Sequence, residues 1–210
     1  MNQTFEHVLP EEIEARSFEI IESELPHPLD PTLAPLIKRV IHTTADFDYA
    51  DSLCFSENVV ERALSAIRSG ACIVTDTNMA KAGINKGLLS KYGGEVYCFM
   101  ADEDVKTAAK EMGTTRAAAS MEKASRISRP LLFAIGNAPT ALIKLRELMD
   151  AGKLAPELII GVPVGFVNVV QAKELIIQSG VSYIVARGRK GGSNVAAAIC
   201  NALLYMLGRD

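Results

Sequence analysis

The run Pro130-Leu131-Leu132-Phe133-Ala134-Ile135 decides the fold, because it is uncharged and shows no alternation of apolar and polar positions. A strand that is apolar on both faces is typical of a parallel sheet covered by helices on each side. Comparable runs lie at residues 71–75, 95–99, 158–162 and 183–186. Strands that alternate with helices indicate an α/β fold. The sequence predicts a three-layer α/β/α sandwich with a mainly parallel sheet and helices near 85–91, 102–111, 115–127, 137–151, 167–179 and 193–207.

The N-terminal part of the chain has a different character. Residues 11–24 show the spacing of an amphipathic helix, and Pro26, Pro28 and Pro31 follow it. Proline lacks an N–H donor and restricts the residue before it, so this link cannot continue the helix. We therefore expect residues 1–30 to form an N-terminal helical arm with a Pro-rich link. The 210 residues suit a single domain, 1–210, with one core.

Composition excludes several classes of protein. The net charge of −3, the 6% of aromatic residues and the absence of Trp argue against a nucleic-acid partner. The sequence holds no apolar run of about 20 residues, the length that a membrane span requires. Residues 1–14 are polar and acidic, unlike a secretory signal, so we expect a cytoplasmic protein. The four Cys form no Cys-x-x-Cys pair, which argues against zinc-binding and redox motifs.

The segment Lys38-Arg39-Val40-Ile41-His42-Thr43-Thr44-Ala45-Asp46 carries the first candidate functional residues. If it is helical, Arg39 and His42 share a face. Thr32 would cap this helix, Pro35 would fit its first turn, and His42 would lie in its last turn. Histidine exchanges a proton near neutral pH, so His42 is the candidate general acid or base; a purely structural histidine is the alternative.

An acidic segment follows at Asp46, Asp48 and Asp51. A magnesium site is conceivable there, but a solvated acidic loop is the commoner arrangement, so we predict no metal site. Ser56 would then cap a helix that runs to about Ser69.

In a parallel sheet the ligand binds outside the carboxyl ends of the strands. Thr75 and Asp76 follow one predicted strand and Asn137 follows another. Arg116 begins a predicted helix, where the helix dipole disfavours a cation, so it hints at an anionic ligand. The last such loop, Arg187–Asn194, carries three cations and three glycines before a helix, and its residues Lys190, Gly191, Gly192 and Ser193 would form a cradle for a carboxylate or phosphate. A solvated basic turn is the alternative.

Six segments together resemble the precorrin-8X methylmutase family, also called cobalt-precorrin-8 methylmutase, over about residues 17–204. They are Arg16-Ser17-Phe18, Arg39–Asp46, Thr75–Met79, Gly136–Leu142, Gly161–Val167 and Gly188–Ser193. The resemblance implies an isomerase that moves a methyl group from C-11 to C-12 of the tetrapyrrole ring, forming hydrogenobyrinate or, on the cobalt route, cobyrinate. It also implies that His42 is the proton donor, that Ser17 and Arg39 contact the substrate, and that the protein is a homodimer.

One departure stands out: Asn168-Val169-Val170-Gln171-Ala172-Lys173 replaces an expected small residue followed by Glu-Ser-Lys, which puts a role for that Glu in doubt. A 1,5 methyl shift needs a protonated, polarised ring, and it needs neither a redox cofactor nor a methyl donor. We therefore expect no cofactor, with cobalt present only as part of the substrate. Two alternatives remain open: a tetrapyrrole carrier without catalysis, and a nucleotide-binding α/β enzyme, although the phosphate-binding glycine fingerprints are missing.

Overall fold

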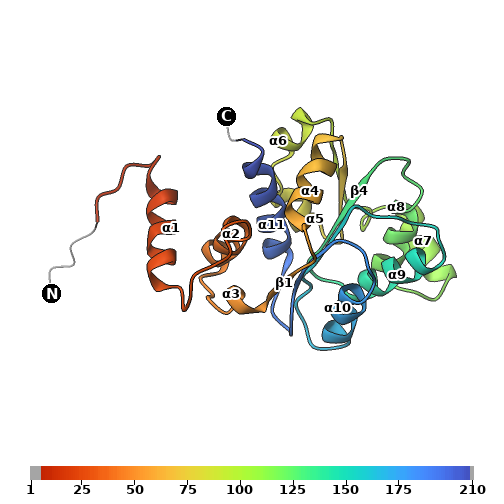
Figure 1. Cartoon of the computed structure of the whole chain (residues 1–210). Coiled ribbons are helices and arrows are strands. Elements are labelled where there is room, and N and C mark those ends of the chain that lie inside the picture. Colours follow the sequence, from red (N-terminus) through yellow and green to blue (C-terminus); the bar gives the residue numbers. More distant parts are fainter. Residues whose placement is uncertain (1–5, 209–210) are drawn as a thin grey trace.

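The computed structural model describes residues 6–208 and confirms the α/β architecture (Figure 1). One six-stranded sheet has the order β1-β6-β5-β4-β2-β3. Only β1 is antiparallel, pairing with β6, and all other neighbours are parallel. The strands are β1 (Leu53–Phe55), β2 (Cys72–Thr75), β3 (Val96–Tyr97), β4 (Leu131–Ile135), β5 (Leu158–Gly161) and β6 (Tyr183–Ala186).

Helices cover both faces of the sheet, because alternate strand residues point to opposite sides. Leu132 and Ala134 belong to a core with α2, α4, α6 and α11, whereas Phe133 and Ile135 belong to a second core with α8, α9 and α10. Figure 1 shows the resulting three layers, with α7 packed outside α8. These helices are α2 (Ala34–Thr44), α4 (Val59–Arg68), α6 (Lys86–Lys91), α7 (Glu103–Glu111), α8 (Arg116–Ala124), α9 (Pro139–Asp150), α10 (Val169–Ile177) and α11 (Ser193–Met206).

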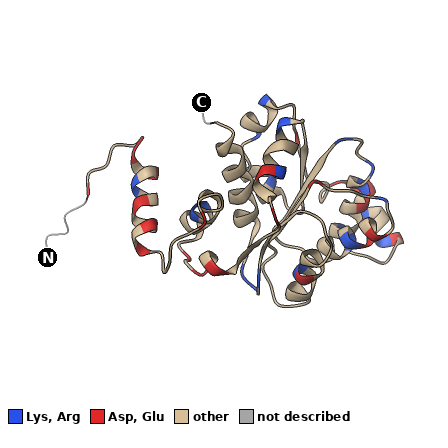
Figure 2. Cartoon of the chain, viewed as in Figure 1, with Lys and Arg blue, Asp and Glu red and all other residues tan. Residues whose placement is uncertain are grey.

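Helix α11 is the centre of the first layer. It contacts α2, α4 and α5 (Asn78–Gly83), and it contains no charged residue, so it is tan throughout in Figure 2. A helix that is buried on most sides needs no polar face. Within residues 6–208, no helix combines the length and the apolar character needed to cross a membrane.

The helix predicted within the arm is present as α1 (Ile13–Glu24), which lies outside α2 at the edge of the molecule (Figure 1), and residues 1–5 of the predicted arm lie outside the described residues. Its Ile21 is buried, while Ile13 and Ile20 on the same helix are exposed. In α2 the apolar stripe is buried as predicted, at Leu36, Ile37, Val40 and Ile41. The orientation of this stripe leaves the last turn of α2 accessible.

Several local predictions were wrong. The short elements α3 (Tyr49–Ser52), β1 and α5 were not predicted, and β3 is shorter than the run 95–99. Thr32 does not cap α2, because the Asp30 carboxylate accepts the N–H groups of Thr32 and Leu33 instead. Ser56 does not cap α4, which begins at Val59; its hydroxyl accepts the N–H of Tyr183 at 2.9 Å and so ties the chain to β6.

Candidate active site

His42 lies in the last turn of α2, as the sequence predicts. Ala45 ends this helix in the left-handed conformation, with its N–H donating to the carbonyl of Ile41. The imidazole of His42 is exposed. It makes an edge-to-face contact with the ring of Phe18, with 5.6 Å between the ring centroids. The ring is therefore held by an aromatic contact and remains accessible to a ligand.

Arg39 lies one turn before His42 and is mostly buried, with 14% of its side chain exposed. Its guanidinium donates to the carboxylate of Glu14 and lies over the rings of Phe18 and Tyr205, at 4.8 and 5.2 Å from their centroids. A cavity of about 470 Å³ adjoins this group and is lined by Glu14, Arg39, Asn85, Gly87, Leu88, Lys91 and Tyr205. Arg39 thus fixes α1 against α2 and α11.

Ser17 is the residue before Phe18 on α1, and its hydroxyl donates to the carbonyl of Ile13 at 2.8 Å. Arg39 and His42 both contact the ring of Phe18. The structure therefore brings Arg39 and His42 together at one aromatic side chain, while Ser17 precedes that residue on α1 and bonds within its own helix.

Asp76 is fully buried at the end of β2. One carboxylate oxygen accepts the N–H of Gly136 at 2.9 Å, and the other accepts those of Asn137 and Ala138 at 2.8 and 2.6 Å. Burial raises the pKa of this carboxyl group, while the N–H donors act in the opposite direction. Ala138 is the N-cap of α9, so Asp76 joins β2 to the start of that helix.

Thr75 and Ser193 also join the loops at this edge of the sheet. The hydroxyl of Thr75 is buried, 3.1 Å from the carbonyl oxygen of Thr77 and 3.2 Å from that of Tyr97. Thr77 caps α5, and its hydroxyl shares a hydrogen bond of 2.7 Å with Ser193, the first residue of α11. The end of β2 is thereby linked to the start of α11.

Glycines allow these loops to approach one another closely. A Cβ atom at Gly136 would lie 2.7 Å from the carbonyl oxygen of Gly192, and one at Gly191 would lie 2.1 Å from that of Val162. Gly192 also donates its N–H to the carbonyl of Val162 at 2.9 Å. The loops after β2, β4, β5 and β6 therefore meet at the carboxyl edge of the sheet, as the sequence predicts.

The side chain of Lys190 pairs with carboxylates at the end of α2. Its Nζ lies 2.7 Å from Asp46 and 2.5 Å from Asp48, and these hydrogen bonds raise the pKa of Lys190. The acidic segment after His42 is therefore engaged with a cation of the loop before α11. This pairing connects the helix end that carries His42 to the edge where the strand loops meet.

Lys173, on α10, is a further candidate residue that the sequence pattern does not single out. Its side chain is fully buried, and its Nζ donates to the carbonyls of Gly188 and Lys190, each at 2.8 Å. Burial lowers the pKa of this ammonium to about 8. A lysine within an amphipathic helix ordinarily indicates an exposed position, so only the structure reveals this one.

Arg116 and Asn137 have exposed side chains. Within residues 6–208, neither side chain forms a hydrogen bond or an ion pair. Arg116 is the first residue of α8, and the N-cap Thr115 shares a hydrogen bond of 2.8 Å with Thr140 in the first turn of α9. Arg116 is therefore placed beside the start of α9, without a direct contact to the other candidate residues.

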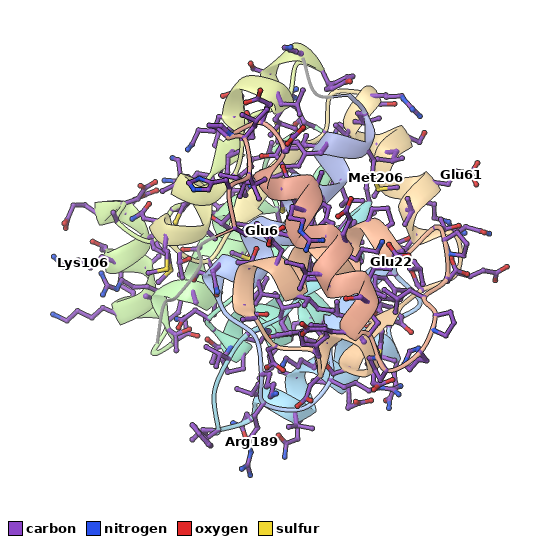
Figure 3. The ribbon with its side chains drawn as sticks, turned by 90° about the vertical axis from the view of Figure 1, so that its left-hand side faces the viewer. Glu6, Glu22, Glu61, Lys106, Arg189 and Met206 are labelled. Carbon is purple, nitrogen blue, oxygen red and sulfur yellow. The ribbon has the colours of Figure 1, made fainter. Side chains whose placement is uncertain are left out.

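Large apolar side chains are exposed in α5, which follows β2, and in the loop after β5. Met79, Val164, Phe166 and Val167 expose 70%, 48%, 80% and 77% of their surface. The guanidinium of Arg189 lies 5.3 Å from the ring centroid of Phe166. Figure 3 shows Arg189 at the lower edge of the molecule, extending away from the ribbon. This edge offers apolar surface and cationic groups side by side.

Comparison with known proteins identifies the family. Residues 12–206 match the family CbiC, precorrin-8X methylmutase. The chain is 44% identical over 197 residues to cobalt-precorrin-8 methylmutase of Priestia megaterium, covering 93% of this chain and 88% of that protein. It is 45% identical over 205 residues to the Salmonella typhimurium enzyme of the same name, covering 94% and 96%.

A solved structure agrees. Precorrin-8X methylmutase from Thermus thermophilus superimposes with a TM-score of 0.83 at 38% identity, covering 93% of this chain and 96% of that chain. Similarity of this extent in both sequence and structure shows that the chain belongs to the precorrin-8X methylmutase family and is an isomerase.

Proposed function

We propose that the protein moves a methyl group from C-11 to C-12 of precorrin-8X or cobalt-precorrin-8 in cobalamin biosynthesis, giving hydrogenobyrinate or cobyrinate, with His42 as the general acid. The observation that carries this proposal is the position of His42. It is the exposed acid–base group at the end of a helix whose following residues, Asp46 and Asp48, pair with Lys190 beside the strand loops.

The chemistry fits such a group. Protonation of the conjugated ring makes the carbon that receives the methyl group electron-poor, and the same proton returns to His42 after migration. A positioned general acid contributes about 10² to 10⁴ in rate. No redox step and no external methyl donor enter this balance, so we propose that the enzyme uses no cofactor of its own and that any cobalt belongs to the substrate.

The substrate's carboxylate arms would meet the remaining candidate residues. We assign substrate contacts to Ser17 and Arg39 beside His42, and to Arg116 and Asn137 at the helix starts. The loop residues Thr75, Asp76, Lys190, Gly191, Gly192 and Ser193 build the floor of the same edge. Asp76 acts there through the N–H groups it holds, because it is fully buried. The exposed Met79 and Val164 would cover the ring faces.

The test compares the wild type with His42→Ala, using the absorption spectrum of precorrin-8X over time, because rearrangement changes the conjugation. We expect kcat to fall by about 10² to 10⁴, since the general acid is lost, with little change in affinity for hydrogenobyrinate. His7→Ala, at an exposed position on the arm, is the matched control and should retain full activity.

Two outcomes would contradict the proposal. If the wild type binds the pigment without converting either the metal-free or the cobalt-containing substrate, the protein is a carrier. If His42→Ala converts substrate at the wild-type rate, another residue is the acid.

We also propose a cytoplasmic homodimer. Support for the dimer comes from apolar side chains that α1 leaves exposed, Ile13 and Ile20, together with those of the strand loops. Sedimentation velocity at micromolar concentration should give the mass of two chains, and a monomer at that concentration would overturn this assignment.

A further inference from the structure

Lys173 is a buried cation that binds backbone carbonyls and no carboxylate within residues 6–208. Burying a charge costs free energy of folding unless hydrogen bonds compensate it. An apolar side chain of similar size could fill the same space without that cost. The position of this ammonium, directly beneath the Gly188–Lys190 segment, therefore needs an explanation in terms of that segment.

The two carbonyls held by Lys173 determine where the neighbouring N–H groups point. Every peptide bond in the described chain is trans, and in a trans peptide the C=O and N–H point in opposite directions. The C=O groups of Gly188 and Lys190 point at Lys173, so the N–H groups of Arg189 and Gly191 point away from it. In the part of the chain described here, neither N–H has a hydrogen-bond acceptor.

The peptide between Arg189 and Lys190 points in the opposite direction, away from Lys173. Its carbonyl, that of Arg189, accepts the N–H of Gly165 at 3.2 Å. Alternating peptides of this kind leave the N–H groups of Arg189 and Gly191 on one side of the loop, where both can donate to the same anion. Gly188 and Gly191, with φ of +76° and +154°, supply the backbone freedom that it requires.

The charges around the segment are mostly engaged already. Lys190 pairs with Asp46 and Asp48, and Arg187 lies 3.8 Å from Glu174. Arg189 contacts the ring of Phe166 and is exposed, and Lys173 lies beneath the loop without a carboxylate partner among the described residues. Asp46 and Asp48 together exceed Lys190 by one negative charge, while Arg189 and Lys173 contribute two positive charges, so the net charge around the two N–H groups is positive and favours an anion.

We propose that Lys173 is a positioning residue, which orients the N–H groups of Arg189 and Gly191 to bind one carboxylate arm of the tetrapyrrole. This inference rests on the proposed function for the identity of the ligand. It assigns the carboxylate to the backbone of the loop and to Arg189, and leaves the Lys190 side chain to hold Asp46 and Asp48.

The test is a thermodynamic cycle with two variants and two ligands. Lys173→Met keeps an unbranched side chain, one atom shorter, and removes the charge and the donors. Binding is measured by isothermal titration calorimetry with hydrogenobyrinate and with its fully methylated ester, which has no carboxylate. We expect Lys173→Met to raise the Kd for hydrogenobyrinate about tenfold or more, and to change the Kd for the ester less than about threefold.

Lys106→Met is the matched control, because among residues 6–208 the Lys106 ammonium pairs only with Glu103 on the surface, and Lys106 lies well apart from Arg189 in Figure 3. It should leave both Kd values unchanged. If Lys173→Met fails to fold, Lys173→Gln retains two N–H donors without the charge and should reduce the difference between acid and ester in the same direction.

Two results would overturn the inference: equal weakening of acid and ester by Lys173→Met, which indicates general loosening, or an unchanged Kd for the acid in the folded variant. Both results differ from a failure of the proposed function. If the proposed function failed, the wild type itself would neither bind hydrogenobyrinate nor convert precorrin-8X.

Discussion

Gly191 lies so close to the backbone of the loop after β5 that no side chain fits there. A Cβ atom would meet the carbonyl oxygen of Val162 at 2.1 Å, and φ is +154°. Gly188, three residues earlier, also has a positive φ of +76°, but a Cβ atom there would have nothing within 4 Å. A side chain at Gly188 would therefore cost only backbone strain, whereas a side chain at Gly191 would cost backbone strain and a steric collision.

We predict that Gly188→Ala lowers the free energy of unfolding by about 1–2 kcal/mol, the cost of a left-handed alanine. Gly191→Ala should cost about 1–3 kcal/mol more, because the loop must also move away from Val162. Urea unfolding of both variants measures the difference. Equal losses would mean that the approach of the two loops does not constrain the site.

At the level of elements, the buried carboxylate of Asp76 couples β2 to α9. It accepts three N–H groups at the turn into that helix, two of them through one oxygen. Hydrogen bonds to a charged group contribute about 1.5–3 kcal/mol each, and an unsatisfied buried donor adds a further cost.

Asp76→Asn is therefore predicted to lower the free energy of unfolding by at least about 2 kcal/mol, because an amide NH₂ replaces one acceptor oxygen. Asp150→Asn, at the other end of α9, removes only a surface pair with Arg146 and should cost less than about 0.5 kcal/mol. Thermal and urea unfolding measure both. A similar small loss in the two variants would show that Asp76 is not the link between these elements.

The elements differ in how well the sequence predicts them. The runs at β4, β5 and β6 are apolar on both faces and flanked by helices, so their pattern reports burial directly. Strand β1 has three residues, too few for a pattern, and its pairing with β6 depends on contacts distant in sequence. The predicted Ser56 cap failed for the same reason, because its hydroxyl accepts the N–H of Tyr183, 127 residues away, whereas the Thr32 cap failed locally, to the Asp30 carboxylate.

The candidate site shows the same division. The chemistry of His42 and the gathering of loops at the carboxyl edge follow from local pattern and from the geometry of parallel sheets. The pairing of Lys190 with Asp46 and Asp48, and the burial of Lys173, depend on how distant segments pack. The sequence thus nominates candidate groups, and the structure supplies the residues that pack against them.

The molecule as a whole carries a negative net charge, but the loop after β6 is locally positive. The chain carries a net charge of −3, while Arg187, Arg189 and Lys190 follow β6 together. The acidic residues are spread over several helices, including α1 (Figure 2). A polycarboxylate ligand is therefore attracted only locally, which favours binding at one edge of the sheet over general association with anions.

We accordingly predict that hydrogenobyrinate stabilises the whole fold and that nucleotides do not. At a ligand concentration of about 100 times Kd, binding adds about 2.7 kcal/mol to the free energy of unfolding. For a chain of this length that corresponds to a rise in Tm of about 5–10 °C. Differential scanning calorimetry should show this rise in the wild type and equally in His42→Ala, because the role proposed for His42 lies in the reaction and not in binding. ATP at the same concentration should leave Tm unchanged, since the loops carry no phosphate fingerprint; a comparable rise with ATP would instead favour a nucleotide ligand at this edge.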